Sequence, residues 1–203
     1  MIATGLIQKS AAEFSPLSMF QLQVSDHLEL RQRHPEDAEE IFALTDSNRD
    51  HLRRWLPWLD HCRTVADTLA NIQSSLHQVS EGSGLGLTVR WNGKIVGLLS
   101  FNYIDKFNRV GQLGYWLGAD FQGHGLMTQA CGALVDYGFE KFGMNRQTIS
   151  AATGNLRSRG VAERLGFTME GIAREAEWLY GRPVDHAIYA LLRSDWEDRR
   201  IMA

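Results

Sequence analysis

The stretch DFQGHGLMTQA, residues 120–130, places two glycines one residue apart between an aromatic-rich segment and a run with helical periodicity. A helix N-terminus exposes unpaired backbone amides and the positive end of the helix dipole, and glycines let those amides approach an anion closely. A plain turn before a helix has the same pattern, which is neither the lysine-bearing P-loop nor the three-glycine dinucleotide motif. The stretch alone therefore leaves an anion site and a flexible turn both open.

The residues before this stretch predict antiparallel strands. LGLTVRWNGKIVGLLSFNYID (85–105) contains two β-type runs joined by Asn92 and Gly93, a strong short-range signal for a hairpin. RVGQLGYWLGADF (109–121) continues as a third strand. The middle of the chain is therefore predicted to be an antiparallel meander.

The residues after it alternate between helix and strand. HGLMTQACGALVDYGFEKFG (124–143) has the period of a helix, with Gly143 expected at its C-cap. RQTISAAT (146–153) is predicted to be a strand, and NLRSRGVAERLGF (155–167) a helix that ends in glycine. Residues 167–196 are predicted to form two final strands with a turn at residues 181–183.

The N-terminal part adds one strand and three helices. Residues 20–34 give a short extended signal, and PEDAEEIFALTD (35–46) opens with proline and acids, as the first turn of a helix prefers. SNRDHLRRWLPWLD (47–60) predicts a short helix capped by Ser47 and stopped by Pro57, and residues 64–82 predict a longer one.

This order predicts an α/β (α+β) fold with a mixed, mostly antiparallel, seven-stranded sheet and helices on both faces. Helix-linked strands run parallel and hairpin-linked strands antiparallel. The switch from strand 114–117 to the helix after Gly125 is the place where a ligand is expected.

Composition sets the class of the protein. The 203 residues fit one domain, expected over residues 19–203, after a poorly ordered extension at residues 1–18. The net charge of −3 argues against direct nucleic-acid binding. Cys62 and Cys131 lack the spacing of a disulfide framework or a zinc site, and the sequence has no signal peptide or apolar run of membrane-spanning length. A cytoplasmic protein with no metal is expected.

Two motifs at a fixed separation carry a resemblance to a known family. QGHGLM (122–127), followed about 30 residues later by NLRSRGVAERLGF, resembles motifs A and B of the GCN5-related N-acetyltransferase (GNAT) superfamily. Met127 departs from the small residue that ends motif A, so the helix must accept a larger side chain. LRRWLPW (52–58) and EGIAREAEWLYGRPVDHAIYALL (170–192) narrow the resemblance to the Rim-type ribosomal-protein N-acetyltransferases.

The resemblance implies an enzyme that transfers acetyl from acetyl-CoA directly to a primary amine. The expected acceptor is the N-terminal amine of a ribosomal or other protein. Two alternatives stay open: a small amine or antibiotic as acceptor, and a catalytically silent acetyl-CoA sensor. The branch also allows a homodimer.

Family motifs likewise imply which residues bind acetyl-CoA. Backbone groups of the first motif would hold the pyrophosphate, and the strand before it would bind the pantetheine arm, whose amides add to a strand edge as a peptide does. Asn155 and Ser158 would reach the arm and its sulfur, although Asn155 is otherwise a plain N-cap and Ser158 a surface hydroxyl. The residues assigned to acetyl-CoA are Tyr115, Trp116, Leu117, Gln122, Gly123, His124, Gly125, Leu126, Met127, Asn155 and Ser158.

The same resemblance assigns Glu177 as the general base and Ser158 as the group that protonates or stabilises the leaving thiolate. Glu177 is otherwise a solvated glutamate on a β face that Glu175 shares, and Asp185 and His186 are weaker candidates. Trp55 and Trp58 are either core residues or the walls of the acceptor site. His124 is expected to matter through its backbone amide, and Cys131 to be a core residue.

Overall fold

The structure is a computed structural model that describes residues 19–202, so the expected extension at residues 1–18 lies outside the described residues. Across residues 19–202 the chain forms one sheet of eight strands, which are β1 (Gln21–Ser25), β2 (Leu28–Gln32), β3 (Leu85–Trp91), β4 (Lys94–Asp105), β5 (Val110–Leu117), β6 (Arg146–Ala152), β7 (Thr168–Leu179) and β8 (Arg182–Leu192). The α-helices of the same range are α1 (Ala38–Ser47), α2 (Arg49–Leu52), α3 (Val65–Glu81), α4 (Leu126–Glu140), α5 (Leu156–Arg164) and α6 (Arg193–Met202).

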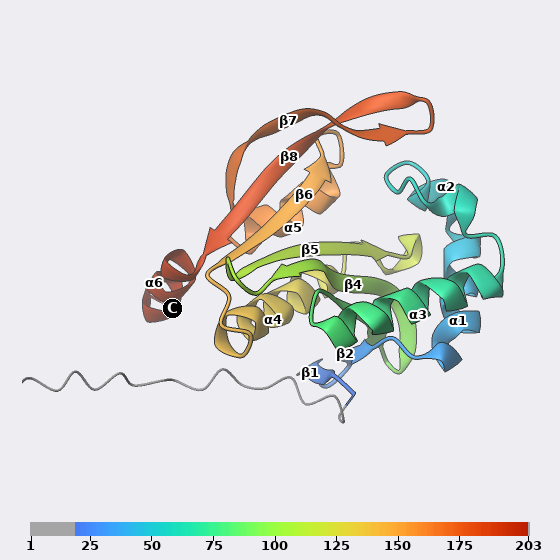
Figure 1. Cartoon of the computed structure of the whole chain (residues 1–203), viewed down its shortest axis with the longest axis horizontal. Helices are drawn as coiled ribbons and strands as arrows, with labels where there is room; N and C mark the ends of the chain where they lie inside the picture. Colours follow the sequence, from blue (N-terminus) through green and yellow to red (C-terminus); the bar gives the residue numbers. More distant parts are fainter. Residues whose placement is uncertain (1–18, 203) are drawn as a thin grey trace, which may run out of the picture.

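The helices cover both faces of the sheet (Figure 1). Successive residues of a strand point to opposite faces, and in β4 Leu98 packs with Ile41 of α1 and Ile72 of α3. Its neighbour Leu99 belongs to the larger cluster, which includes Leu134 of α4. The α/β class with helices on both faces is therefore confirmed.

Local signals fixed several elements as expected. Asn92 and Gly93 have φ of 50° and 79° and join β3 to β4 in the predicted hairpin. Helix α3 begins with a capping box, in which Thr64 and Asp67 satisfy each other's backbone amides, and it ends at Gly82 with φ of 65°.

Two expectations near the chain ends were wrong. The segment at residues 20–34 is a hairpin of β1 and β2, which raises the strand number from seven to eight in the described residues. The last predicted strand ends at Leu192, and α6 follows because Trp196 stacks on Phe139 at 5.1 Å and donates to Asp136 at 2.6 Å. Such contacts between distant residues leave no local sequence signal.

Two helix boundaries also differ. Helix α1 runs through Ser47, so this serine caps nothing, and Asn48 separates α1 from α2. The Asn48 Oδ1 atom instead accepts a hydrogen bond of 2.8 Å from the Ala119 amide, which ties α2 to the segment before the glycines. Helix α4 has Lys141 as its C-cap, and Gly143 lies beyond it with φ of 64°.

The sheet opens between β5 and β6. These neighbours pair in parallel only from Val110 with Arg146 to Leu113 with Ile149 in the described residues. Beyond that point β5 stays paired with β4 through Leu117, and β6 stays paired with β8 through Ala152, so the two strands diverge toward the side where α2 lies (Figure 1). The diverging edge of β5 is left without a partner in β6.

No helix in the described range has the length and apolar character needed to cross a membrane.

Candidate functional site

The loop between β5 and α4 is built to present backbone amides. Gly123 and Gly125 have φ of 84° and 73°, a left-handed conformation that favours glycine. Gly125 is the N-cap of α4 and has no side chain to bond the first helical amides. A Cβ at Gly123 would meet no atom of the described residues within 4 Å. The first turn of α4 is therefore open to an anion.

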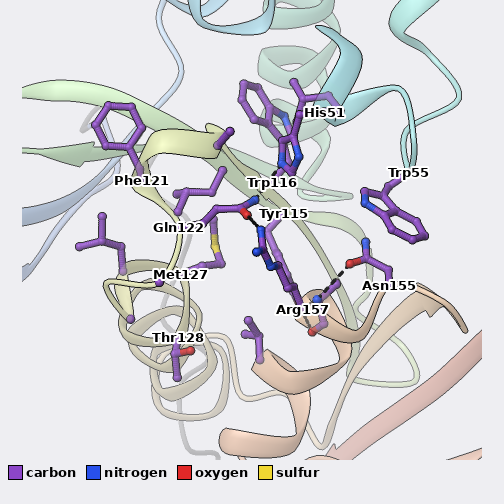
Figure 2. Close-up of a pocket in the computed structure, with 18 of the residues that line it drawn as sticks. His51, Trp55, Tyr115, Trp116, Phe121, Gln122, Met127, Thr128, Asn155 and Arg157 are labelled. Carbon is purple, nitrogen blue, oxygen red and sulfur yellow. Dashed lines mark hydrogen bonds between the residues drawn. The ribbon is translucent and has the colours of Figure 1, made fainter. Parts of the chain in front are cut away.

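A cavity of about 610 Å³, here called the glycine-loop cleft, lies in front of these amides (Figure 2). Its walls are α2, the diverging edge of β5, the glycine loop and the start of α5. Ten of the residues that the sequence assigned to acetyl-CoA line it, namely Tyr115, Trp116, Leu117, Gln122, Gly123, Gly125, Leu126, Met127, Asn155 and Ser158.

His124, the remaining residue assigned to acetyl-CoA, does not line the glycine-loop cleft. The His124 ring stacks on Trp91 with a centroid distance of 5.8 Å, so the imidazole packs against the β3 end. Met127 is buried, at 7% exposure, within the larger core cluster. The helix therefore accepts the larger side chain at the position where the motif departs from the family pattern.

The cleft contains polar side chains that sequence reasoning missed. Arg157 donates to the Gln122 Oε1 atom, and the Gln122 Nε2 atom donates at 2.8 Å to Nε2 of His51 (Figure 2). Burial, and then the charges of Arg54 and Arg157, lower the pKa of His51, so its ring is neutral at neutral pH. Arg157 lies inside the NLRS motif and could have been found as a cation beside an amide cradle, whereas His51 reaches the cleft only through the placement of α2.

A second cavity of about 680 Å³, here called the cross-sheet groove, runs over the other side of the opening. Trp55 and Trp58 both line it, and Trp58 is 36% exposed. The two cavities share a junction, whose residues are Trp55, Leu56, Tyr115, Trp116, Asn155 and Ser158. Trp55 and Trp58 therefore wall a cavity and are not simply core residues.

Tertiary contacts hold the loop that carries Trp55 and Trp58 in place. The Arg53 guanidinium lies 3.7 Å from the centre of the Tyr180 ring, and the Tyr180 hydroxyl donates at 2.7 Å to the Leu56 carbonyl. Arg53 also pairs with Asp60. These contacts fasten the loop after α2 to the β7–β8 hairpin on the opposite side of the groove.

Two hydroxyl groups meet at the junction. Tyr115 donates at 2.8 Å to the Ser158 backbone carbonyl, and the Ser158 Oγ atom donates at 3.3 Å to the Tyr115 hydroxyl. Burial raises the pKa of Tyr115, which keeps its proton throughout the physiological range. Asn155 is the N-cap of α5, since its Oδ1 atom accepts from the Ser158 amide at 3.2 Å. The plain N-cap reading of Asn155 is thus correct, and the cap also orients Ser158.

Glu177 lies in the cross-sheet groove beside a histidine. Its Oε2 atom is 3.3 Å from Nε2 of His186, and Nδ1 of that ring is 2.9 Å from the Ser150 hydroxyl. The carboxylate and the imidazole are 24% and 17% exposed. The half-buried chain from Ser150 to Glu177 therefore holds a carboxylate in a fixed orientation facing the groove.

The expectation that Glu175 shares this face was wrong. The pairing of β7 with β8 shifts between Ala173 and Glu177, and Glu175 lies on this bulge with φ of 50° and an exposed side chain. Asp185 stabilises the bulge by accepting from the Glu175 amide at 2.8 Å. Of the weaker candidates, only His186 lines the groove among the described residues.

The family follows from the match of the acetyltransferase (GNAT) domain model to residues 27–168, most of the chain. The chain belongs to the GNAT acetyltransferase family. The resemblance drawn from the two motifs is thereby confirmed.

Similar proteins cover nearly the same length. The chain is 35% identical to YdaF of Bacillus subtilis over 184 residues, which are 90% of this chain and 100% of YdaF. The solved structure of RimL, a ribosomal L7/L12 alpha-N-protein acetyltransferase in complex with coenzyme A, superposes with a TM-score of 0.84 at 29% identity, covering 87% of this chain and 99% of that one. The structure of the microcin C7 self-immunity acetyltransferase MccE, in complex with acetyl-CoA and AMP, superposes with a TM-score of 0.80 at 33% identity. The match covers 83% of this chain and 94% of that one.

This GNAT protein is an acetyl-CoA-dependent N-acetyltransferase. Its glycine-loop cleft fits acetyl-CoA, because uncapped amides at the start of α4 suit a pyrophosphate and the unpaired edge of β5 suits the amides of pantetheine. Within residues 19–202, no cluster of three or more His, Cys, Asp or Glu side chains is placed to hold a metal ion.

Replacing Arg157 with methionine is expected to weaken acetyl-CoA binding by about 10-fold, because the guanidinium adds positive charge beside the amides of α4. The dissociation constant is measured by isothermal titration calorimetry at low and high salt. Lys141→Met, at the other end of α4, is the matched control and is expected to bind normally. Equal affinity of the two variants would contradict this role for Arg157.

Proposed function

We propose that this enzyme acetylates the N-terminal amine of a protein, with ribosomal proteins as the expected class. The observation that carries the proposal is the junction between the two cavities, where Ser158 and Tyr115 lie between the acetyl-CoA cleft and a groove that contains Glu177. The groove extends from this junction across the sheet toward β3, which provides room for several residues of a polypeptide. A carboxylate held by His186 in the groove that contains the junction residues supports catalysis and not a silent sensor.

In the proposed reaction, the amine nitrogen bonds to the carbonyl carbon of the thioester and the carbon–sulfur bond breaks. Glu177 accepts a proton from the incoming ammonium, which otherwise has no free lone pair. His186 holds the carboxylate in position through the 3.3 Å contact. Overall the nitrogen loses two protons, of which one leaves through Glu177 to solvent and one ends on the sulfur.

The residues at the junction act on the leaving group. Ser158 donates a hydrogen bond, and then a proton, to the departing sulfur. Tyr115 stays protonated and accepts at 3.3 Å from the Ser158 hydroxyl, which holds this hydroxyl at the junction. The second proton of the nitrogen passes to Ser158 and replaces the proton that the serine gives to the sulfur. The open edge of β5 holds the arm in register with this pair, which turns the transfer into an oriented encounter of two bound reactants.

Similarity supports the choice of acceptor. RimL is named for acetylation of the α-amine of ribosomal L7/L12, and it matches nearly the full length of this chain. MccE is named for self-immunity to microcin C7, and its similarity keeps a small amine or antibiotic as the second candidate.

The acceptor is tested by incubating the protein with labelled acetyl-CoA and whole ribosomes, followed by mass spectrometry of the labelled protein. Label on the N-terminus of one ribosomal protein is the expected result. Unlabelled ribosomes, together with thioester consumption in the presence of a polyamine, amino acid or aminoglycoside, would instead identify a small-amine enzyme.

The proposal includes three further expectations from the sequence. The enzyme works in the cytoplasm, it makes no direct contact with nucleic acid, and it is able to form a homodimer. Sedimentation velocity at several concentrations tests the dimer, and a ribosomal RNA-binding assay tests the second expectation.

A further inference from the structure

We propose that the far end of the cross-sheet groove recognises an acidic side chain of the acceptor peptide through Arg33, at about the third or fourth residue from the acetylated amine. This inference rests on the proposed function and names the acceptor sequence class. The occupant is an N-terminal peptide that carries an aspartate or glutamate near its start.

Arg33 is a half-buried cation without an ion-pair partner among the described residues. Its side chain lies over Gly86 of β3, where a Cβ would come within 3.1 Å of the guanidinium Nε. That Nε atom is buried and has no hydrogen-bond partner in the described range, while Nη1 donates to Asn71 Oδ1 at 3.1 Å. Burial lowers the pKa of Arg33 to about 10, which leaves it positively charged at neutral pH.

The neighbouring Arg31 and Arg90 also have a buried Nε atom without a hydrogen-bond partner in the described range, so Arg33 differs from them only in lacking a carboxylate partner. Arg31 and Arg90 both reach the buried carboxylate of Asp37, at 2.6 Å and 2.7 Å. A desolvated guanidinium that lacks such a carboxylate is costly for the folded protein. An anion that arrives with the substrate would remove this cost, because arginine binds carboxylates with charge-assisted hydrogen bonds.

The charges around the groove favour an anion at this end. Arg33 is the one arginine or lysine that lines the groove within residues 19–202. The Asp67 carboxylate, which also lines it, already accepts from the amides of Arg63 and Thr64 and from the Thr64 hydroxyl. Glu177 is held by His186 at the opposite end. The lining carboxylates are thus engaged elsewhere, and the Arg33 charge remains available.

The floor of the groove sets the distance between the charge and the reaction. Gly86, Ser100 and Gly114 occupy directly opposite positions on β3, β4 and β5, and Gly114 precedes the junction residue Tyr115. Adjacent strands are about 4.8 Å apart, so Arg33 lies about 10 Å from the junction. An extended peptide advances about 3.3 Å per residue, which places its third or fourth side chain at Arg33. The α-carboxylate of a free amino acid is too close to its own amine to reach.

The test compares peptides that differ at one position. Peptides of equal length carry glutamate or glutamine at each position from the second to the sixth, and kcat/KM is measured with the wild type, Arg33→Met and Lys94→Met. The wild type and Lys94→Met, which changes an exposed residue at the start of β4, are expected to prefer glutamate at the third or fourth position by about 10-fold to 100-fold. Arg33→Met is expected to reduce this ratio to about one.

The unfolding temperature separates recognition from structural support. Arg33→Met is expected to keep or raise the unfolding temperature, because the change removes a half-buried charge that has no ion-pair partner among the described residues. Arg90→Met is expected to lower it, because the buried Asp37 carboxylate loses a partner. A lower unfolding temperature for Arg33→Met would overturn the inference in favour of a structural role.

The kinetic results also distinguish failure of this inference from failure of the proposed function. If the wild type acetylates glutamate and glutamine peptides equally, the inference is wrong and the proposed function stands. If it acetylates no peptide and no ribosomal N-terminus, both are wrong.

Discussion

Replacing Glu177 with glutamine is expected to lower kcat by about 10²-fold to 10⁴-fold, the usual contribution of a general base. The amide keeps the size of the side chain and a contact with His186, but it cannot accept the proton of the incoming ammonium. Steady-state kinetics with an acceptor peptide measure kcat. The dissociation constant of acetyl-CoA is expected to stay at the wild-type value, because Glu177 lines the cross-sheet groove and not the glycine-loop cleft in the described structure.

Glu175 provides a matched control two residues away. Its side chain is exposed on the bulge of β7, so Glu175→Gln removes the same charge without touching the groove. Normal turnover of Glu175→Gln is expected. Normal turnover of Glu177→Gln would transfer the role of the base to another group, with His186 as the next residue to test.

Replacing Ser158 with alanine is expected to lower kcat by about 100-fold while acetyl-CoA still binds. The change removes the hydroxyl at the junction and leaves the backbone carbonyl that holds Tyr115. Because burial raises the pKa of Tyr115, its hydroxyl does not ionise from about pH 6 to about pH 9, and the loss is expected to be constant across this range. A pH profile of kcat for both proteins measures this.

Conservative replacement tests whether the hydroxyl itself matters. Ser158→Thr keeps the hydroxyl and is expected to retain more activity than Ser158→Ala. A thiolate of a more acidic thiol leaves with less need of protonation. With a thioester donor of such a thiol, Ser158→Ala is therefore expected to lose less of the wild-type kcat than with acetyl-CoA. Equal losses with both donors would show that Ser158 acts in positioning and not on the leaving group.

Much of the fold was accessible from local patterns. The Asn92–Gly93 hairpin, the helix over residues 64–82 and the helix after Gly125 were all predicted, because each depends on residues close together in the chain. The β1–β2 hairpin was missed because its turn at residues 26–27 lacks a glycine, and α6 was missed because its contact with α4 joins distant residues. Local propensity does not report such long-range packing.

Some residues of the candidate site were predicted from sequence motifs, and others were found only in the structure. The motif residues Gly123, Gly125, Asn155 and Ser158 line the glycine-loop cleft as the family resemblance implied. Their catalytic roles stay predictions until the variants are measured. Arg157 was missed although it lies inside the NLRS motif. His51 and Ser150 could not be predicted, since their roles arise from contacts with Gln122 and His186 that the folded chain creates.

The sequence by itself determined the family and the amide cradle. Motif spacing and the positions of glycines are properties of the linear chain, so they can be recognised without the folded structure. Only the tertiary structure decided where the sheet opens. Strands β5 and β6 diverge beyond Leu113 because each remains paired on its other side, and this opening joins the cleft to the groove. Only the fold also placed Arg33 over Gly86 without an ion-pair partner among residues 19–202, since charge pairing depends on distances in space and not on separation along the chain.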